Sequence, residues 1–220
     1  MSRPLPHRFA NGATVLGHYR VSQISGAIAA TPAAQDHWAR IRWTGITNNA
    51  RLVLCRLQVG LSVSGAITTL LQQTLNAIIA RSYTVDHSTA ITNISMVNKN
   101  GAMDSRTMQN SLMGTTGPGI CTTAPMTGQT ATLDASPFAR VDLPLITAVT
   151  ATGTAIAGAV GVASGMQDLY VWNTLGEHPP TLESGEGIIV RTELAGHATG
   201  TLTLRTVWHW AEVINPFGNE

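Results

Sequence analysis

The chain has 220 residues, of which 44% are hydrophobic and only 11% charged, less than half of the roughly 25% usual in soluble domains. The length is enough for one domain with its own core, and the net charge of +1 provides no broad basic field, so direct binding of nucleic acid is not expected. Because so little charge leaves an isolated chain poorly soluble, we expect partner subunits to cover much of its surface and predict a homo-oligomer.

The first 20 residues show neither the period of a strand nor that of a helix. They contain several prolines and glycines and no apolar stretch of the kind found in signal peptides. We therefore predict an extended N-terminal arm over residues 1–20 and no signal peptide. A strand of small residues is expected from Ile24 to Ala30, with Pro32 ending it.

The clearest early pattern is strict alternation over two neighbouring segments. Ala39, Ile41 and Trp43 share one face of the first segment, as expected for a half-buried strand. Asn48-Asn49 then offers a turn, because Asn tolerates positive φ. Apolar residues recur at every second position of the next segment: Val53, Cys55, Leu57, Val59, Leu61 and Val63. The two segments together predict a hairpin.

Residues 66–80 carry two conflicting patterns. Apolar residues from Ile67 to Ile79 follow the i, i+3, i+4, i+7 spacing of an amphipathic helix. The segment AIIARSYT, from Ala77 to Thr84, has the composition of a strand. A short helix that leads into a strand near residue 76 satisfies both patterns.

Residues 86–140 are rich in Asn, Thr, Gly, Met and Pro, which predicts short strands separated by long loops. The better strand candidates here and just beyond are Thr130–Leu133, Leu143–Thr150 and Leu169–Trp172. The stretch from Leu143 to Met166 carries no charge, but it is mostly Thr, Ala and Gly. Its apolarity is too weak for a membrane span, so we expect buried or subunit-facing strands and no membrane contact.

The last third is the most regular part of the sequence. Ile188–Leu194 is a strand rich in β-branched residues, and a Gly-containing loop follows it. Beyond the loop, Leu202, Leu204, Thr206, Trp208 and Trp210 share one face. We predict that these two strands form a hairpin that closes a sheet.

Many short strands with Gly, Pro and Asn turns predict an all-β fold, a β-sandwich or jelly-roll-like domain with at most one short helix. The expected organisation is an N-terminal arm over residues 1–20, the sandwich over residues 21–214 and a C-terminal tail over residues 215–220.

No motif for catalysis, metal binding or cofactor binding is apparent. The chain lacks a G-x-S-x-G elbow and a G-x-x-x-x-G-K-[ST] loop. His178, Glu183 and Glu186 mix metal-ligand types, but no H-x-H pair accompanies them, so they are interpreted as loop residues. Cys55 and Cys121 lack C-x-x-C spacing, and we predict two reduced cysteines in a protein made in a cytosol. The chain is expected not to be an enzyme.

Tryptophans are the remaining candidates for a functional surface. Trp43, Trp208 and Trp210 lie on apolar strand faces, which favours core packing over a sugar-stacking platform. Trp38 falls on the other face of its strand, beside Arg40 and Arg42. Because Trp and Arg are enriched at interface hot spots, Trp38, Arg40 and Arg42 are the candidate interface residues.

The order of several segments resembles a group of tailed-bacteriophage virion proteins similar to capsid decoration (cement) proteins. The segments are ISGAIAA, HWARIRWT, RLVLCRLQVGLSV, AIIARSYT, GEHPPTLESGEGIIVRTEL and WHWAEV, which span residues 24–213. The block from GEHP to GEGIIVR and the terminal WAEV are the most specific pieces. The sequence departs from the group in its N-terminal arm and in WHW, where a single Trp is expected.

The resemblance implies a β-sandwich subunit that oligomerises, often as a trimer, and docks on the lattice of the major capsid protein. The expected role is then to stabilise the phage head from the capsid surface of the virion, after synthesis in the host cytoplasm. A carbohydrate-binding tail or spike component that uses exposed Trp is the alternative, and a cupin-like metalloenzyme is a third hypothesis.

Overall fold

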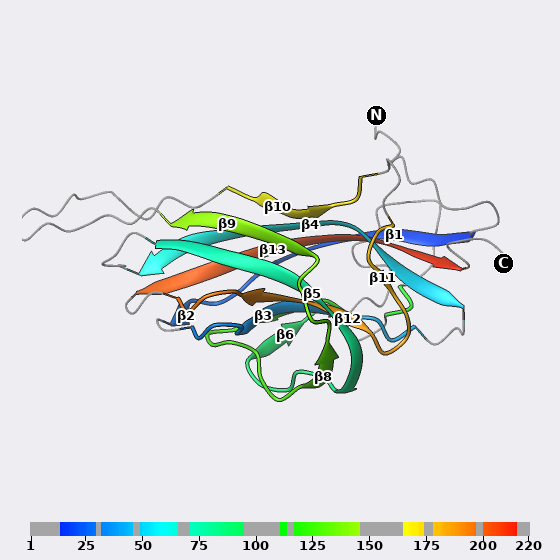
Figure 1. The fold of residues 1–220 in the computed structure, drawn as a ribbon, viewed down its shortest axis with the longest axis horizontal. Helices are drawn as coiled ribbons and strands as arrows, with labels where there is room; N and C mark the ends of the chain where they lie inside the picture. The colour runs from blue at the N-terminus through cyan, green and yellow to red at the C-terminus, as the bar shows by residue number, and fades with distance from the viewer. Residues whose placement is uncertain are drawn as a thin grey trace, which may run out of the picture.

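The computed structural model describes residues 14–29, 32–45, 49–65, 71–94, 111–113, 117–145, 165–173, 178–196 and 200–214. They form strands and loops arranged as two antiparallel sheets that pack face to face, a β-sandwich (Figure 1). The all-β prediction is confirmed. Among these ranges the structure contains no helix long and apolar enough to cross a membrane.

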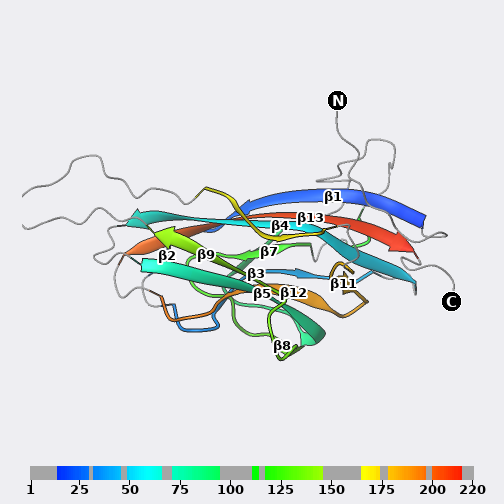
Figure 2. The same cartoon turned by 45° about the horizontal axis from the view of Figure 1, so that its top comes forward.

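The first layer, called sheet A here, has six strands and lies uppermost in Figure 2. Its order is β1 (Thr14–Ile24), β13 (Thr201–Ile214), β4 (Ala50–Gly65) and β10 (Gln167–Val171). Two short strands complete it: β2 (Ile28–Ala29) pairs with β13, and β11 (Thr181–Leu182) pairs with β4. The long antiparallel pair of β4 and β13 forms the centre of this sheet.

The second layer, sheet B, has seven strands. Its order is β6 (Ile91–Asn93), β7 (Gly119–Cys121), β3 (His37–Arg42), β12 (Gly187–Thr192), β5 (Leu71–Val85) and β8 (Thr130–Leu133). β9 (Ala139–Leu145) pairs with the first half of β5, and β8 pairs with its second half. The long strand β5 therefore pairs with two strands along the same edge.

Both predicted hairpins are wrong, because the chain changes sheets at each expected turn. β3 lies in sheet B, whereas β4 lies in sheet A. β12 and β13 are likewise in different sheets, so the loop between them crosses the sandwich. Period-2 alternation identifies a half-buried strand but carries no information on which strand pairs with it. β4 instead pairs with β13, which lies about 150 residues further along the chain.

The core lies between the sheets and is built around tryptophans. Trp43, Trp208 and Trp210 are at most 1% exposed, and they share one buried cluster with Leu202 and Leu204. Their predicted place in the core is confirmed. Each buried indole removes on the order of 200 Å² from water, so these side chains supply a large share of the hydrophobic stabilisation.

A β-bulge decides which residues of β4 face this core. His209 of β13 pairs with Arg56, but Trp210 pairs with Leu54, so Cys55 is an extra residue in the ladder. The inserted residue reverses the alternation. Along β4, core-facing residues change from even to odd positions across it: Leu52 and Leu54 on one side, and Leu57, Val59 and Leu61 on the other. Val53 and Cys55, expected on the face of Leu57, belong to a separate cluster on the outer face of sheet A.

Two further boundaries differ from the sequence-based expectations. Residues 14–20 belong to β1 and not to an arm, and Tyr19 of this strand is 1% exposed. Residues 71–76 form the first part of β5 and not a helix, whereas the predicted strand from Ala77 to Thr84 lies within β5 (Leu71–Val85). The apolar spacing there resembles a helix because β5 is buried on both faces, with Leu75 in the main core and Ile78 in a smaller cluster. Residues 1–13, 66–70, 146–164 and 215–220 lie outside the described ranges.

Two glycines make room for core aromatic rings. A Cβ atom at Gly17 would lie 2.7 Å from the hydroxyl oxygen of Tyr19, and one at Gly45 would overlap the indole of Trp43. Trp43 cannot move away easily, because it is fully buried and its Nε1 donates to the carbonyl of Ala50 at 3.2 Å. The backbone of each glycine thus packs directly against a ring.

The contact between Gly45 and the Trp43 ring can be tested by mutation. Substituting Gly45→Ala should lower the free energy of unfolding by about 1–3 kcal/mol, because the added methyl overpacks the Trp43 ring. The same substitution at Gly165, where a Cβ would meet nothing within 4 Å, should have little effect. Urea denaturation followed by tryptophan fluorescence measures both, and equal losses would contradict the overpacking explanation.

Candidate functional site

The predicted interface residues Trp38, Arg40 and Arg42 lie on β3, but the first two are fully buried. A second bulge explains the position of Trp38. Val190 pairs with Ala39, but Arg191 pairs with His37, so Trp38 is the extra residue and joins the core cluster. The prediction of exposed anchors at Trp38 and Arg40 is therefore wrong. Arg42 retains a side-chain exposure of 20%.

Arg40 organises a network on the outer side of sheet B. Its Nε and Nη2 donate to the two carboxylate oxygens of Asp86, at 3.0 and 2.8 Å. Nη2 also donates to Asn93 Oδ1 at 2.8 Å, and Nη1 donates to the carbonyl of Gly117 at 2.7 Å. One guanidinium thereby joins β3 to the end of β5, to β6 and to the segment that precedes β7.

The charges in this network stabilise each other. Burial lowers the pKa of Arg40, and the neighbouring Asp86 carboxylate opposes that shift. Burial also raises the pKa of Asp86, but hydrogen bonding by His87 and the charge of Arg40 outweigh it, and the net shift is downward. Arg42 adds a second positive charge, with Nη1 at 3.8 Å from Asp86 Oδ2 and its guanidinium 5.4 Å from the centre of the Tyr83 ring. The pair is thus held in its ionised form.

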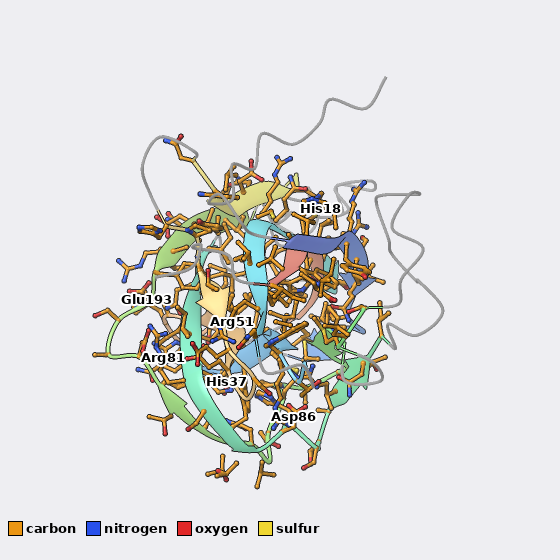
Figure 3. All side chains as sticks on the ribbon, turned by 90° about the vertical axis from the view of Figure 1, so that its right-hand side faces the viewer. His18, His37, Arg51, Arg81, Asp86 and Glu193 are labelled. Carbon is orange, nitrogen blue, oxygen red and sulfur yellow. The ribbon has the colours of Figure 1, made fainter. Side chains whose placement is uncertain are left out.

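Two histidines extend the network. His37 Nδ1 lies 3.0 Å from His87 Nε2 and 3.1 Å from Gln129 Nε2, and both imidazoles are almost completely buried. Figure 3 shows His37 and Asp86 close together in the lower layer, on the opposite side of the molecule from His18. Burial, followed by the charges of His87 and Arg191, lowers the pKa of His37 to about 4. His37 is therefore neutral at pH 7.

A second polar cluster surrounds Glu212, which is completely buried between the sheets. Its carboxylate accepts hydrogen bonds from the Ser111 hydroxyl, from the backbone N–H of Leu112 at 2.9 Å and from Trp210 Nε1 at 3.2 Å. Burial raises its pKa, and these hydrogen bonds oppose the shift. Glu212 holds residues 111–113 against the core. Period-2 alternation could have found it, because Glu212 shares the face of Trp208 and Trp210.

These clusters serve structure better than catalysis. The Arg40 guanidinium and the Asp86 carboxylate are engaged with each other and with backbone. The thiols of Cys55 and Cys121 are free but buried, which raises the pKa of each to about 12 and leaves poor nucleophiles. Within the described ranges, no group of three or more His, Cys, Asp or Glu side chains is placed to hold a metal ion.

The acidic loop residues singled out in the sequence are also engaged elsewhere. Glu183 pairs with Arg51 at 2.9 Å, and Glu186 lies 3.5 Å from Arg81. A comparison of the chain with protein-family models gives no match, and a comparison with curated protein sequences gives none either.

The Arg40 network predicts a measurable difference between two arginines that both form two-pronged pairs with an aspartate. Arg40→Met should lower the free energy of unfolding by about 3 kcal/mol, because Asp86, Asn93 and the carbonyl of Gly117 lose their donor in a buried site. Arg56→Met removes the ion pair with Asp168. Because the Arg56 side chain is 41% exposed, this substitution should lower the free energy of unfolding by less than about 1 kcal/mol. Equal losses in urea denaturation would refute the structural role of Arg40.

The histidine pair predicts acid sensitivity. The pKa of His37 is lower in the folded chain than the 6.5 of an unperturbed histidine, so the unfolded chain binds more protons between about pH 4 and 6.5. Stability therefore falls as the pH falls through this window, by about 2 kcal/mol at pH 5 from His37 alone. His37→Gln should remove that part of the difference between pH 7 and pH 5. The same substitution at the exposed His178 is the control, and an unchanged pH dependence in His37→Gln would contradict the assignment.

Proposed function

We propose that this protein is a structural subunit of a tailed-bacteriophage virion, which binds the major capsid protein lattice and stabilises the head as a decoration protein. The observation that carries the proposal is that the chain has few charged residues and that most of the described ones are paired within the chain. The described carboxylates are engaged within the chain, either with arginines or with hydrogen-bond donors. With only 11% charged residues, the chain has a surface with few charges, and the exposed carboxylates that the structure describes are held in ion pairs or hydrogen bonds.

Such a surface is suited to association. An uncharged face loses little solvation free energy when a partner covers it, whereas a charged face loses much. A subunit that bridges neighbouring capsid proteins favours the assembled shell by mass action and needs no catalytic pocket. The resemblance of the segment order to decoration proteins supports the same role, with a homo-oligomer, favoured as a trimer, as the working unit at the capsid surface. Neither an enzymatic activity nor direct binding of nucleic acid is part of this proposal.

The alternative of a carbohydrate-binding tail or spike component draws less support. Sugar binding by stacking needs an exposed aromatic ring. Trp38, Trp43, Trp208 and Trp210 are all at most 1% exposed, and in the described ranges only Trp172 keeps partial exposure. A stacking platform of tryptophans would have to rest on that single described indole, and Phe138 and Tyr170 are the other described Phe, Tyr or Trp rings with partial exposure.

The proposal is tested on particles that lack this protein. Heads purified from a deletion of its gene should release DNA at a lower temperature than complete heads, and adding the purified protein back should restore the release temperature. DNA release is followed by a dye that fluoresces on free DNA, with an unrelated β-sandwich protein as the add-back control. Deletion particles as heat-stable as complete ones would remove the stabilising role.

A further inference from the structure

Two arginines stand apart from the internal charge pairing. The other described arginines contact a carboxylate or an amide of the chain: Arg40, Arg42, Arg51, Arg56, Arg81, Arg140 and Arg191. Within the part of the chain that the structure describes, Arg20 and Arg205 have no such partner, and both side chains are exposed. Two uncompensated cations in a chain with so little charge call for a physical explanation.

Both arginines lie on the same surface, the outer face of sheet A at the β1 edge. On β1, Tyr19 and Val21 are buried and point to the core, so Arg20, Ser22 and Ile24 point outward. On β13, Leu204, Thr206 and Trp208 are buried, which places Arg205, Val207 and His209 on the outer face.

The strand register brings these residues together. Arg20 pairs with His209, Ser22 with Val207, and Ile24 with Arg205. Four residues of an extended strand separate Arg20 from Ile24, so the two guanidinium groups are anchored on the order of 13 Å apart, one on each strand. We call this outward surface of β1 and β13 the Arg20–Arg205 face.

Its composition combines positive charge with one apolar contact point. Ile24 is 59% exposed, one of the most exposed large hydrophobic side chains described. The neighbouring β4 contributes Arg56, which pairs with His209 in the ladder and forms an ion pair with Asp168. Counting Arg20, Arg56 and Arg205 against Asp168 gives a local net charge of +2.

We propose that the Arg20–Arg205 face is a docking surface for an acidic patch on another protein, with carboxylates on the two arginines and an apolar side chain against Ile24. This inference rests on the proposed function insofar as it identifies that protein with the capsid shell. Guanidinium groups bind carboxylates in a two-pronged geometry, which fixes orientation as well as adding attraction. Charge complementarity of this kind guides association and selects the partner.

The observations favour a different protein over two other occupants. A second copy of this chain is a poor source of anions, because its described carboxylates already have partners and would have to give them up. A nucleic acid backbone is bound by many cations, and two free arginines with an exposed isoleucine beside one of them supply too few. An acidic protein surface uses both the charges and the apolar side chain.

His209 offers a local reporter of occupancy. It is half-buried between the strands that carry Arg20 and Arg56, and burial followed by these two positive charges lowers its pKa to about 4. A partner carboxylate that neutralises Arg20 would relieve part of this repulsion. Because docking changes both the burial and the charges around His209, its titration should shift in the complex, which NMR detects.

The test compares two double variants with the same change in net charge. Arg20→Ala/Arg205→Ala removes the two free cations, whereas Arg81→Ala/Arg140→Ala removes two half-exposed arginines from β5 and β9 of the other sheet. Binding to heads that lack this protein is measured by co-sedimentation over a range of salt concentrations. The first variant should bind roughly ten-fold more weakly than wild type and show a smaller dependence on salt, and the second should bind as wild type. Equal binding by both variants would overturn the docking surface and leave the proposed function intact.

Poly-L-glutamate is a second probe, which distinguishes failure of the proposed function from failure of the docking surface. If wild-type protein does not bind heads at all, the proposed function fails, and poly-L-glutamate then tests the surface by itself. Binding of poly-L-glutamate that is lost in Arg20→Ala/Arg205→Ala supports an acidic protein partner. No binding of poly-L-glutamate, stronger arginine-dependent binding of duplex DNA, or loss of self-association in that variant by sedimentation velocity would each overturn it.

Discussion

The structure depends on the pairing of β4 with β13 at the centre of sheet A. This ladder extends over nearly the whole length of both strands and joins segments that are far apart in the chain. A strand sends consecutive side chains to opposite faces, so the register of this one pair decides which side chains enter the core. The bulge at Cys55 keeps Trp208 and Trp210 on the core face of β13 while β4 presents leucines on both sides of the bulge. The other layer packs against the surface that results.

Buried polar groups then attach the irregular segments to that frame. Arg40 joins β3 to the end of β5, to β6 and to Gly117, and Glu212 holds residues 111–113 from the core side. Each is a charged group in a site of low polarity, where leaving a partner out is costly and a complete set of partners defines one conformation. These segments also contribute Met113 and Ile120 to the main core, so polar and apolar contacts together fix their positions.

The pairing of charged side chains within the chain also bears on the proposed role. The described acidic side chains are engaged within the chain, and most of the described arginines pair with them, so few of the described charges are left unpaired. Solubility then favours a protein that is covered by partners. Against that neutral background, Arg20 and Arg205 concentrate positive charge on one face beside an exposed Ile24. Charges placed in this way favour a partner of complementary charge over others.

The sequence by itself determined the fold class and much of the core. Alternation identified the strands that contain Ile41, Leu57 and Trp208, because a half-buried strand must place apolar residues at every second position. It also predicted two free cysteines, as the structure has them at Cys55 and Cys121. It predicted the strand from Ala77 to Thr84 but failed for residues 71–76 of β5, since a strand buried on both faces has no alternation and its apolar spacing resembles that of a helix.

Tertiary structure decided the pairing, the faces and the polar sites. Strand partners depend on contacts across the whole chain, which is why the β3–β4 and β12–β13 connections turned out to cross between sheets. Alternation could not predict the bulge at Trp38. A bulge depends on how two strands pair, and it reverses the direction of a side chain without any mark in the sequence. Trp38 therefore moved from a predicted interface to the core, and Arg40 from the surface to a buried network. The sequence states the chemistry of each side chain, whereas residues distant in the chain determine its burial and its partners.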